Sequence, residues 1–210
     1  MIADLKIKEV KNFLPDSLAN ELHDIMTGNQ FPWYWLDDVT AAPYDRKEVP
    51  ETYHSQPGMH HTPWVDGNAS EWFPHFSFIY HYIREELGLD QHMWYLARIR
   101  CGLNFATFRP DHNLHNTPHV DYPETASGNH YTCLYYVNDS DGPTVVFHET
   151  KQSEEYNIAY RCHPEKNKLF IFNGKHYHAS SCPKTHDARI ALTINLVERK
   201  PNVERLLRAA

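Results

Sequence analysis

The chain has 210 residues, of which 41% are hydrophobic and 22% are charged, and its net charge is −7. A chain of this length can bury one hydrophobic core, so one domain is expected. The negative charge disfavours non-specific nucleic-acid binding, which needs clustered Lys and Arg. No apolar run approaches the ~20 residues of a membrane span. We therefore expect a single domain with no membrane partner.

The cysteines and the first residues indicate the compartment. The start, MIADLKIKEV, lacks the basic and apolar regions of a secretory signal. The four cysteines contain no C-x-x-C pair; they are Cys101, Cys133, Cys162 and Cys182. Free thiols in a reducing cytoplasm are the simpler interpretation.

A first helix is expected in LPDSLANELHDIM, where apolar residues recur at helical spacing from Leu18 to Met26. Asp16 or Ser17 is available as its N-cap. Residues 30–70 mix aromatics with prolines and are expected to be irregular. Their aromatic side chains either pack over the core or line a pocket, and packing is favoured.

A second helix is expected before residue 88. Gly88 fits the position just after its end, because glycine adopts left-handed backbone readily. Its apolar face consists of Phe76, Ile79, Tyr80, Ile83 and Leu87.

From about residue 93 the hydrophobic period changes to two, which is typical of strands. The runs are MWYLARIRCGLNF, YTCLYYVN, PTVVFHE, EYNIAYR, KLFIFNG and ARIALTINLV. Helices followed by many short strands predict a mainly β, α+β chain, with helices backing a sandwich or barrel. Residues 1–92 would form the helical and loop part, and residues 93–198 the β core.

His119 and Asp121 carry the first chemical signal. Positions i and i+2 of an extended segment point the same way, so both side chains can converge on one ion. A third ligand is needed, and His176 and His178 have the same parity. His178 is preferred because it leads into the segment that contains Arg189, eleven positions on. Two histidines and one carboxylate leave three coordination positions open, as in non-haem Fe(II) oxygenases.

Arg189 opens the polar face of the strand RIALTINLV. Its planar guanidinium can bind a carboxylate through two hydrogen bonds, which a lysine cannot reproduce. The alternative is a surface arginine in a salt bridge. The other residues of the same face are Ala191, Thr193 and Asn195.

In YTCLYYVND, alternation places Thr132, Leu134 and Tyr136 on one face. The Thr132 face could line the site. Tyr136 could donate its hydroxyl to the carboxylate that Arg189 holds, or it could simply pack in the core.

These segments resemble the 2-oxoglutarate- and Fe(II)-dependent oxygenases, and the prolyl 4-hydroxylase-like branch in particular. HVDYP, TCLYYVND and RIALT are similar to segments of the oxygen-sensing prolyl hydroxylases. FLPDSLANELHDIM followed by FPWYW is similar to small stand-alone members from phage and bacteria. The likeness to the catalytic core covers residues 95–198. The gap from His178 to Arg189 is slightly longer than in the oxygen-sensing enzymes.

The resemblance implies one oxygenase domain over residues 1–210, with a double-stranded β-helix (jelly roll) over residues 93–198. The implied iron ligands are His119, Asp121 and His178. The implied residues for 2-oxoglutarate are Arg189, Tyr136 and Thr132, with Arg189 on the distal carboxylate. If the chain is phage-encoded, the compartment would be the host cytoplasm.

The implied reaction uses Fe(II), 2-oxoglutarate and O2, with ascorbate as reductant. It hydroxylates a C–H bond and converts 2-oxoglutarate to succinate and CO2. The substrate, a small molecule or a peptide, is not identified. Residues 30–70 are expected to shape that choice. Asn104 and the segment RPDHNLHNT could also contact substrate, although an ordinary loop is favoured.

Other interpretations remain open. A cupin-like jelly roll could bind metal without oxygenase activity, but it leaves Arg189 and Tyr136 without a role. A non-catalytic binding or virion module predicts no stoichiometric metal. A zinc hydrolase lacks an H-E-x-x-H motif, and Asp121 disfavours a halogenase, which needs a small residue there.

Overall fold

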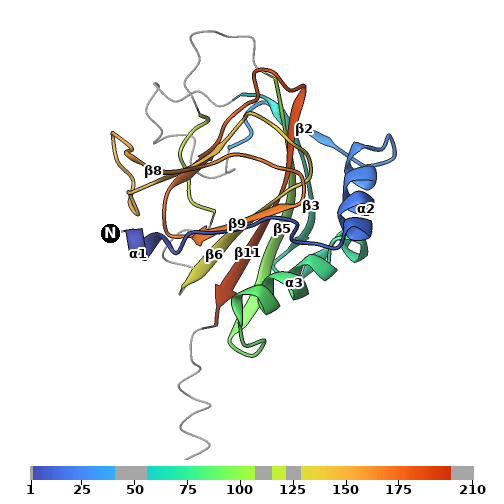
Figure 1. Cartoon of the computed structure of the whole chain (residues 1–210), viewed down its shortest axis with the longest axis horizontal. Helices are drawn as coiled ribbons and strands as arrows, with labels where there is room; N and C mark the ends of the chain where they lie inside the picture. Colours follow the sequence, from blue (N-terminus) through green and yellow to red (C-terminus); the bar gives the residue numbers. More distant parts are fainter. Residues whose placement is uncertain (1, 41–55, 107–114, 122–128, 200–210) are drawn as a thin grey trace, which may run out of the picture.

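The structure is a computed structural model that describes residues 2–40, 56–106, 115–121 and 129–199. Two antiparallel sheets dominate it (Figure 1). The larger sheet follows the order β1 (Lys8–Val10), β9 (Lys168–Asn173), β6 (His130–Tyr136), β11 (Ala188–Glu198), β5 (Trp94–Phe105), β3 (Gly58–Val65) and β2 (Tyr34–Leu36), with β4 (Asn68–Ala69) beside β3. The smaller sheet follows the order β10 (His178–Ser180), β7 (Thr144–Phe147) and β8 (Ile158–Cys162).

Four helical elements precede most of the strands. They are α1 (Ile2–Leu5), α2 (Asp16–Thr27), the 3-10 helix η1 (Phe73–His75) and α3 (Phe78–Leu87). In Figure 1, α2 and α3 lie together on one side of the larger sheet, and β8 lies on the other. The expected arrangement, with helices behind a β core, is therefore present.

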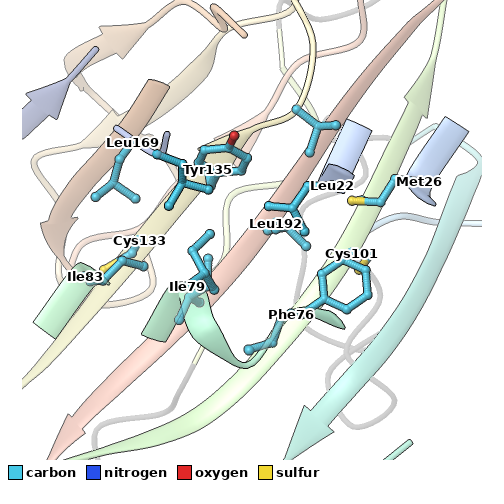
Figure 2. Packing of buried hydrophobic residues seen from close by; sticks show 14 of the residues in the cluster. Leu22, Met26, Phe76, Ile79, Ile83, Cys101, Cys133, Tyr135, Leu169 and Leu192 are labelled. Atoms are coloured by element: carbon cyan, nitrogen blue, oxygen red, sulfur yellow. The ribbon is translucent and has the colours of Figure 1, made fainter. Parts of the chain in front are cut away.

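The helices are held to the sheet by an apolar core (Figure 2). Side chains such as Leu22 of α2 and Ile79 of α3 pack against alternate residues of the central strands. The β11 residues of this face are fully or nearly fully buried: Ile190, Leu192, Ile194 and Leu196. The opposite face of the same strands, toward the smaller sheet, carries both a second apolar cluster, which includes Leu134 and Ala191, and polar side chains such as Thr132 and Asn195.

The helix ends were only partly predicted. Gly88 ends α3 with φ 61°, as expected. The predicted cap of α2 is wrong, because Pro15 holds the N-cap position and no side chain caps the helix. Asp16 is instead the first helical residue, where its negative charge still favours the helix dipole.

The prediction that residues 30–70 are irregular is wrong. Its described residues include β2, β3 and β4, which extend the larger sheet beyond β5. The pairing of β3 with β5 changes register between His61 and Trp64. That break disturbs the alternation by which a strand is recognised. Residues 41–55 lie outside the described part.

The four cysteines are free, as expected. In the part of the chain that the structure describes, no helix is long and apolar enough to cross a membrane.

Candidate metal centre

Three predicted ligands meet between the two sheets. His119 and Asp121 come from the connection between β5 and β6, and His178 begins β10. One ligand atom of each lies within 4.8 Å of the others. His119 Nε2 is 4.0 Å from Asp121 Oδ1, and His178 Nε2 is 3.7 Å from Asp121 Oδ2. The three side chains therefore point at one common position.

The backbone fixes how the two imidazoles face. His119 and His178 form an isolated antiparallel bridge, in which each backbone N–H donates to the other's carbonyl at 3.0 and 2.9 Å. Each ring Nδ1 lies near a carbonyl oxygen, that of Thr117 at 3.1 Å and that of His176 at 3.3 Å. These contacts place the ring protons on Nδ1, which leaves both Nε2 lone pairs free for a metal.

The Asp121 carboxylate is held by three other side chains. Arg98 donates to Oδ1 at 2.5 Å, while Asn195 and Thr132 donate to Oδ2 at 2.8 and 3.3 Å. Arg98 also donates to the Asn195 side chain at 3.0 Å, so the group forms one network. Burial opposes ionisation, but Arg98, the two histidines and Asn195 hold the pKa of Asp121 far below its usual range. Asp121 is thus an anion at any physiological pH.

The histidines have the opposite tendency. Burial lowers the pKa of His178 to about 4 and also lowers that of His119, although nearby Asp121 counteracts it. Neutral imidazole is the form that binds metal. Two neutral imidazoles and one carboxylate fit a divalent ion such as Fe(II).

His176, the alternative third ligand, points elsewhere. Its Nδ1 donates to the Phe147 carbonyl at 3.0 Å, and its Nε2 is 3.8 Å from a carboxylate oxygen of Asp4. It is equally buried, at 4% exposure, but does not belong to the three-residue cluster. The structure therefore brings together His178, and not His176, with the first two residues.

A pocket opens beside the cluster. Its empty space, open mouth included, is about 550 Å³. It is lined by Val39, Thr40, Met59, Arg100, Gly102, Leu103, Asn104, His119, Asp121, Leu134, Thr144, His178, Ser180, Arg189, Ala191 and Thr193. A small organic acid and part of a substrate can share such a space.

Arg189 lies at the pocket wall and is 4% exposed. It donates to the Asn104 side chain at 3.2 Å and to Thr144 Oγ1 at 2.7 Å. Its Nε has no hydrogen-bond partner among the described residues. A buried guanidinium with unused donors is suited to a carboxylate, and the surface salt bridge considered as its alternative is absent from this part of the chain.

Tyr136 and Thr132 have the expected orientation but different contacts. The Tyr136 hydroxyl donates to Thr144 Oγ1 at 2.8 Å, and its ring lies 5.4 Å from the Arg189 guanidinium carbon. Neither residue is among those that line the pocket. Thr132 contacts Asp121 instead. The pocket residues that contact Arg189 are thus Asn104 and, from the smaller sheet, Thr144.

The sequence interpretation missed Arg98, Arg100 and Thr144. In LARIRCGLNF, the two arginines share a parity opposite to buried Ala97 and Ile99, and two charges inside an apolar strand were a usable signal. Asn104 was noted and lies beside Arg189. Of the segment RPDHNLHNT, residues 109–114 lie outside the described part.

Comparison with known proteins agrees with this geometry. Residues 103–197 match the sequence model of the 2OG-Fe(II) oxygenase superfamily. A search of the curated proteins finds no match. Over residues 103–197, which include the three ligands and Arg189, the chain is therefore similar to the 2OG-Fe(II) oxygenase superfamily, and this similarity supports a dioxygenase that uses Fe(II), 2-oxoglutarate and O2.

Solved structures share the fold. A prolyl hydroxylase from Trichoplax adhaerens, in complex with a hypoxia inducible factor peptide fragment, is 14% identical, with 98% of this chain and 88% of that chain covered and a TM-score of 0.60. The viral collagen prolyl hydroxylase of Paramecium Bursaria Chlorella virus-1 is 10% identical, with 92% of this chain and 96% of that chain covered and a TM-score of 0.52. The carbocyclase SnoK from nogalamycin biosynthesis is 9% identical, with 98% of this chain and 87% of that chain covered and a TM-score of 0.62. These likenesses confirm the predicted jelly roll.

Proposed function

We propose that this chain hydroxylates a C–H bond of a small-molecule or peptidyl substrate. The iron ligands are His119, Asp121 and His178, and Arg189 holds the distal carboxylate of 2-oxoglutarate. The observation that carries the proposal is the convergence of three ligand atoms beside a pocket whose wall contains a buried arginine with an unused donor.

When bound, Fe(II) and 2-oxoglutarate supply an O2-dependent oxidation that yields succinate, CO2 and a hydroxylated product. The protein supplies the positions. Arg98 and Asn195 keep the Asp121 carboxylate charged and oriented. The apolar side chains of Leu134 and Ala191 line the same pocket and limit water around the reacting carbon.

Hydroxylation is proposed because two of the similar structures are prolyl hydroxylases. The carbocyclase SnoK, however, has the same fold. The fold therefore does not determine the outcome of the reaction, which depends on the bound substrate. We also propose that ascorbate supports turnover by re-reducing iron.

The proposal is tested without knowing the substrate. Purified protein with Fe(II), O2 and ascorbate is expected to form succinate slowly from 2-oxoglutarate, and each component is expected to be required. His178→Ala is expected to abolish both this turnover and stoichiometric Mn(II) binding, because one of three ligands is lost. His176→Ala is the matched control, since it removes an equally buried histidine two residues away.

Loss of metal in His176→Ala alone would assign the third ligand to His176. A protein that binds neither Mn(II) nor 2-oxoglutarate would contradict the proposed function altogether.

A further inference from the structure

Arg100 is a pocket residue that the reaction described above does not use. It lies on β5 and lines the pocket together with the metal ligands. One N–H group donates to the Val39 carbonyl at 3.0 Å. A guanidinium has five such donors, and in the described ranges no carboxylate lies within ion-pair distance of Arg100. Arg98, two residues earlier, is by contrast paired with Asp121.

The charge of the pocket is also unbalanced. Among the described lining residues, Asp121 is the only carboxylate, whereas Arg100 and Arg189 are both cationic. A divalent metal and the 2-oxoglutarate dianion would cancel each other. The loaded pocket would therefore keep an excess of positive charge in a chain whose net charge is −7. An anionic group on the remaining ligand, the substrate, would balance it.

Strand register places Arg100 away from Arg189. Arg189 pairs with Asn104, and Arg100 pairs with Thr193, four residues earlier on β5. The separation along the strand is about 13 Å. Two residues before Arg100 on the same face of β5, Arg98 pairs with Asn195, and both side chains bind Asp121. Arg100 thus lies close to the metal end of the pocket, and Arg189 lies at the other end.

The surroundings of Arg100 differ from those of Arg189. Near Arg189 the wall includes Thr144 of the smaller sheet. Near Arg100 it includes Val39, whose carbonyl accepts a hydrogen bond from Arg100. This second wall belongs to elements that contribute no metal ligand. It is the natural place for the substrate beside the metal.

We propose that Arg100 binds a carboxylate group of the substrate and so restricts this enzyme to acids. The proposal rests on the proposed function and names its substrate class. One planar guanidinium matches the two oxygens of a carboxylate. Thr193, which pairs with Arg100 and also lines the pocket, offers a hydroxyl beside it. A phosphate has three terminal oxygens that share a charge of about −1.5 to −2, so it would overcompensate the excess charge and present one more oxygen than a planar guanidinium matches.

The test uses acetate as the simplest carboxylate probe. Protein loaded with Mn(II) and 2-oxoglutarate is titrated with acetate, and the paramagnetic broadening of the acetate methyl protons is measured. Acetamide is the neutral control, and inorganic phosphate is the competing anion. We expect saturable broadening by acetate and none by acetamide. Arg100→Gln is expected to weaken acetate binding at least tenfold, and Arg100→Lys by less.

Arg161→Gln is the matched control, because it removes one positive charge from an exposed position on β8. It is expected to change acetate binding less than twofold. Unchanged broadening in Arg100→Gln would overturn the proposal, because acetate would then bind directly to the metal or elsewhere. Preference for phosphate would overturn the substrate class. A loss of 2-oxoglutarate affinity in Arg100→Gln, with acetate binding intact, would assign the residue to the co-substrate.

Binding of Mn(II) and of 2-oxoglutarate is measured first and separately, so that failure of the proposed function is recognised. In that case the arginine side-chain NMR signals of the metal-free protein report acetate binding directly. An Arg100 signal that does not shift would overturn the inference on its own.

Discussion

Thr144 links two residues that the sequence associates with 2-oxoglutarate. Its Oγ1 accepts hydrogen bonds from both Tyr136 and Arg189. Because both lone pairs are then used, its own proton is free to point into the pocket that Thr144 lines. Tyr136 contacts Thr144 but does not itself line the pocket. At the scale of single residues, a hydroxyl from the smaller sheet therefore completes the acid end of the pocket.

We expect Thr144→Val to weaken 2-oxoglutarate binding roughly 10- to 150-fold, the effect of the about 1.5–3 kcal/mol of one hydrogen bond to a charged group. Tyr136→Phe is expected to cost less, since it leaves the Thr144 hydroxyl in place. Anaerobic calorimetry with Mn(II) would measure both affinities, with Arg189→Ala as the severe reference. A larger loss in Tyr136→Phe than in Thr144→Val would mean that Tyr136 itself reaches the acid.

Each central strand of the larger sheet has two distinct faces. On β11, Leu192 packs toward the helices, whereas Thr193 lines the pocket. On β5, Cys101 packs toward the helices, whereas Arg100 lines the pocket. The strands therefore separate the residues that determine stability from those that determine binding.

This separation predicts the effect of Ile79→Ala in α3. Ile79 is fully buried against the helix-facing side of the sheet. Its truncation is expected to lower the free energy of unfolding by roughly 2–5 kcal/mol. Mn(II) and 2-oxoglutarate affinities, measured below the unfolding transition, are expected to change less than twofold. Urea unfolding and calorimetry would check the two outcomes, and a tenfold loss of affinity would show that helix packing controls the pocket.

The same alternation explains how much of the molecule could be predicted. Period-two runs located most strands of the core, and fixed parity placed Arg189 and the Thr132 face correctly. The strand β3 was missed because its register changes, and β10 because three residues give no period. The partners of Arg189 could not be predicted, since Thr144 comes from a second sheet and parity within one strand says nothing of the facing one.

At the scale of the whole molecule, the site joins the two sheets. Arg189 and the residues that hold Asp121 belong to the larger sheet, whereas His178 and Thr144 belong to the smaller one. A ligand that contacts both sheets binds the folded state and not the unfolded chain. Its binding free energy then adds to the stability of the fold.

Mn(II) and 2-oxoglutarate, each at about 100 times its dissociation constant, are expected to stabilise the protein by about 2.7 kcal/mol per ligand. For a chain of this size, one such increment raises the melting temperature by roughly 5–10 °C. Differential scanning fluorimetry would measure it. In Asp121→Ala the increment from Mn(II) is expected to disappear, and an undiminished shift would place the metal elsewhere.

The paired backbone hydrogen bonds between His119 and His178 have a practical consequence for handling the protein. Because they set the spacing of two nitrogen donors before any ion arrives, the chain cannot choose its ion by folding around it. Divalent metal ions then compete for the site according to their intrinsic affinity for its ligands, and nickel, copper and zinc bind such ligands more tightly than iron does. Protein purified over nickel resin is expected to carry the wrong ion, so it needs chelation and anaerobic reloading with iron before its activity is measured.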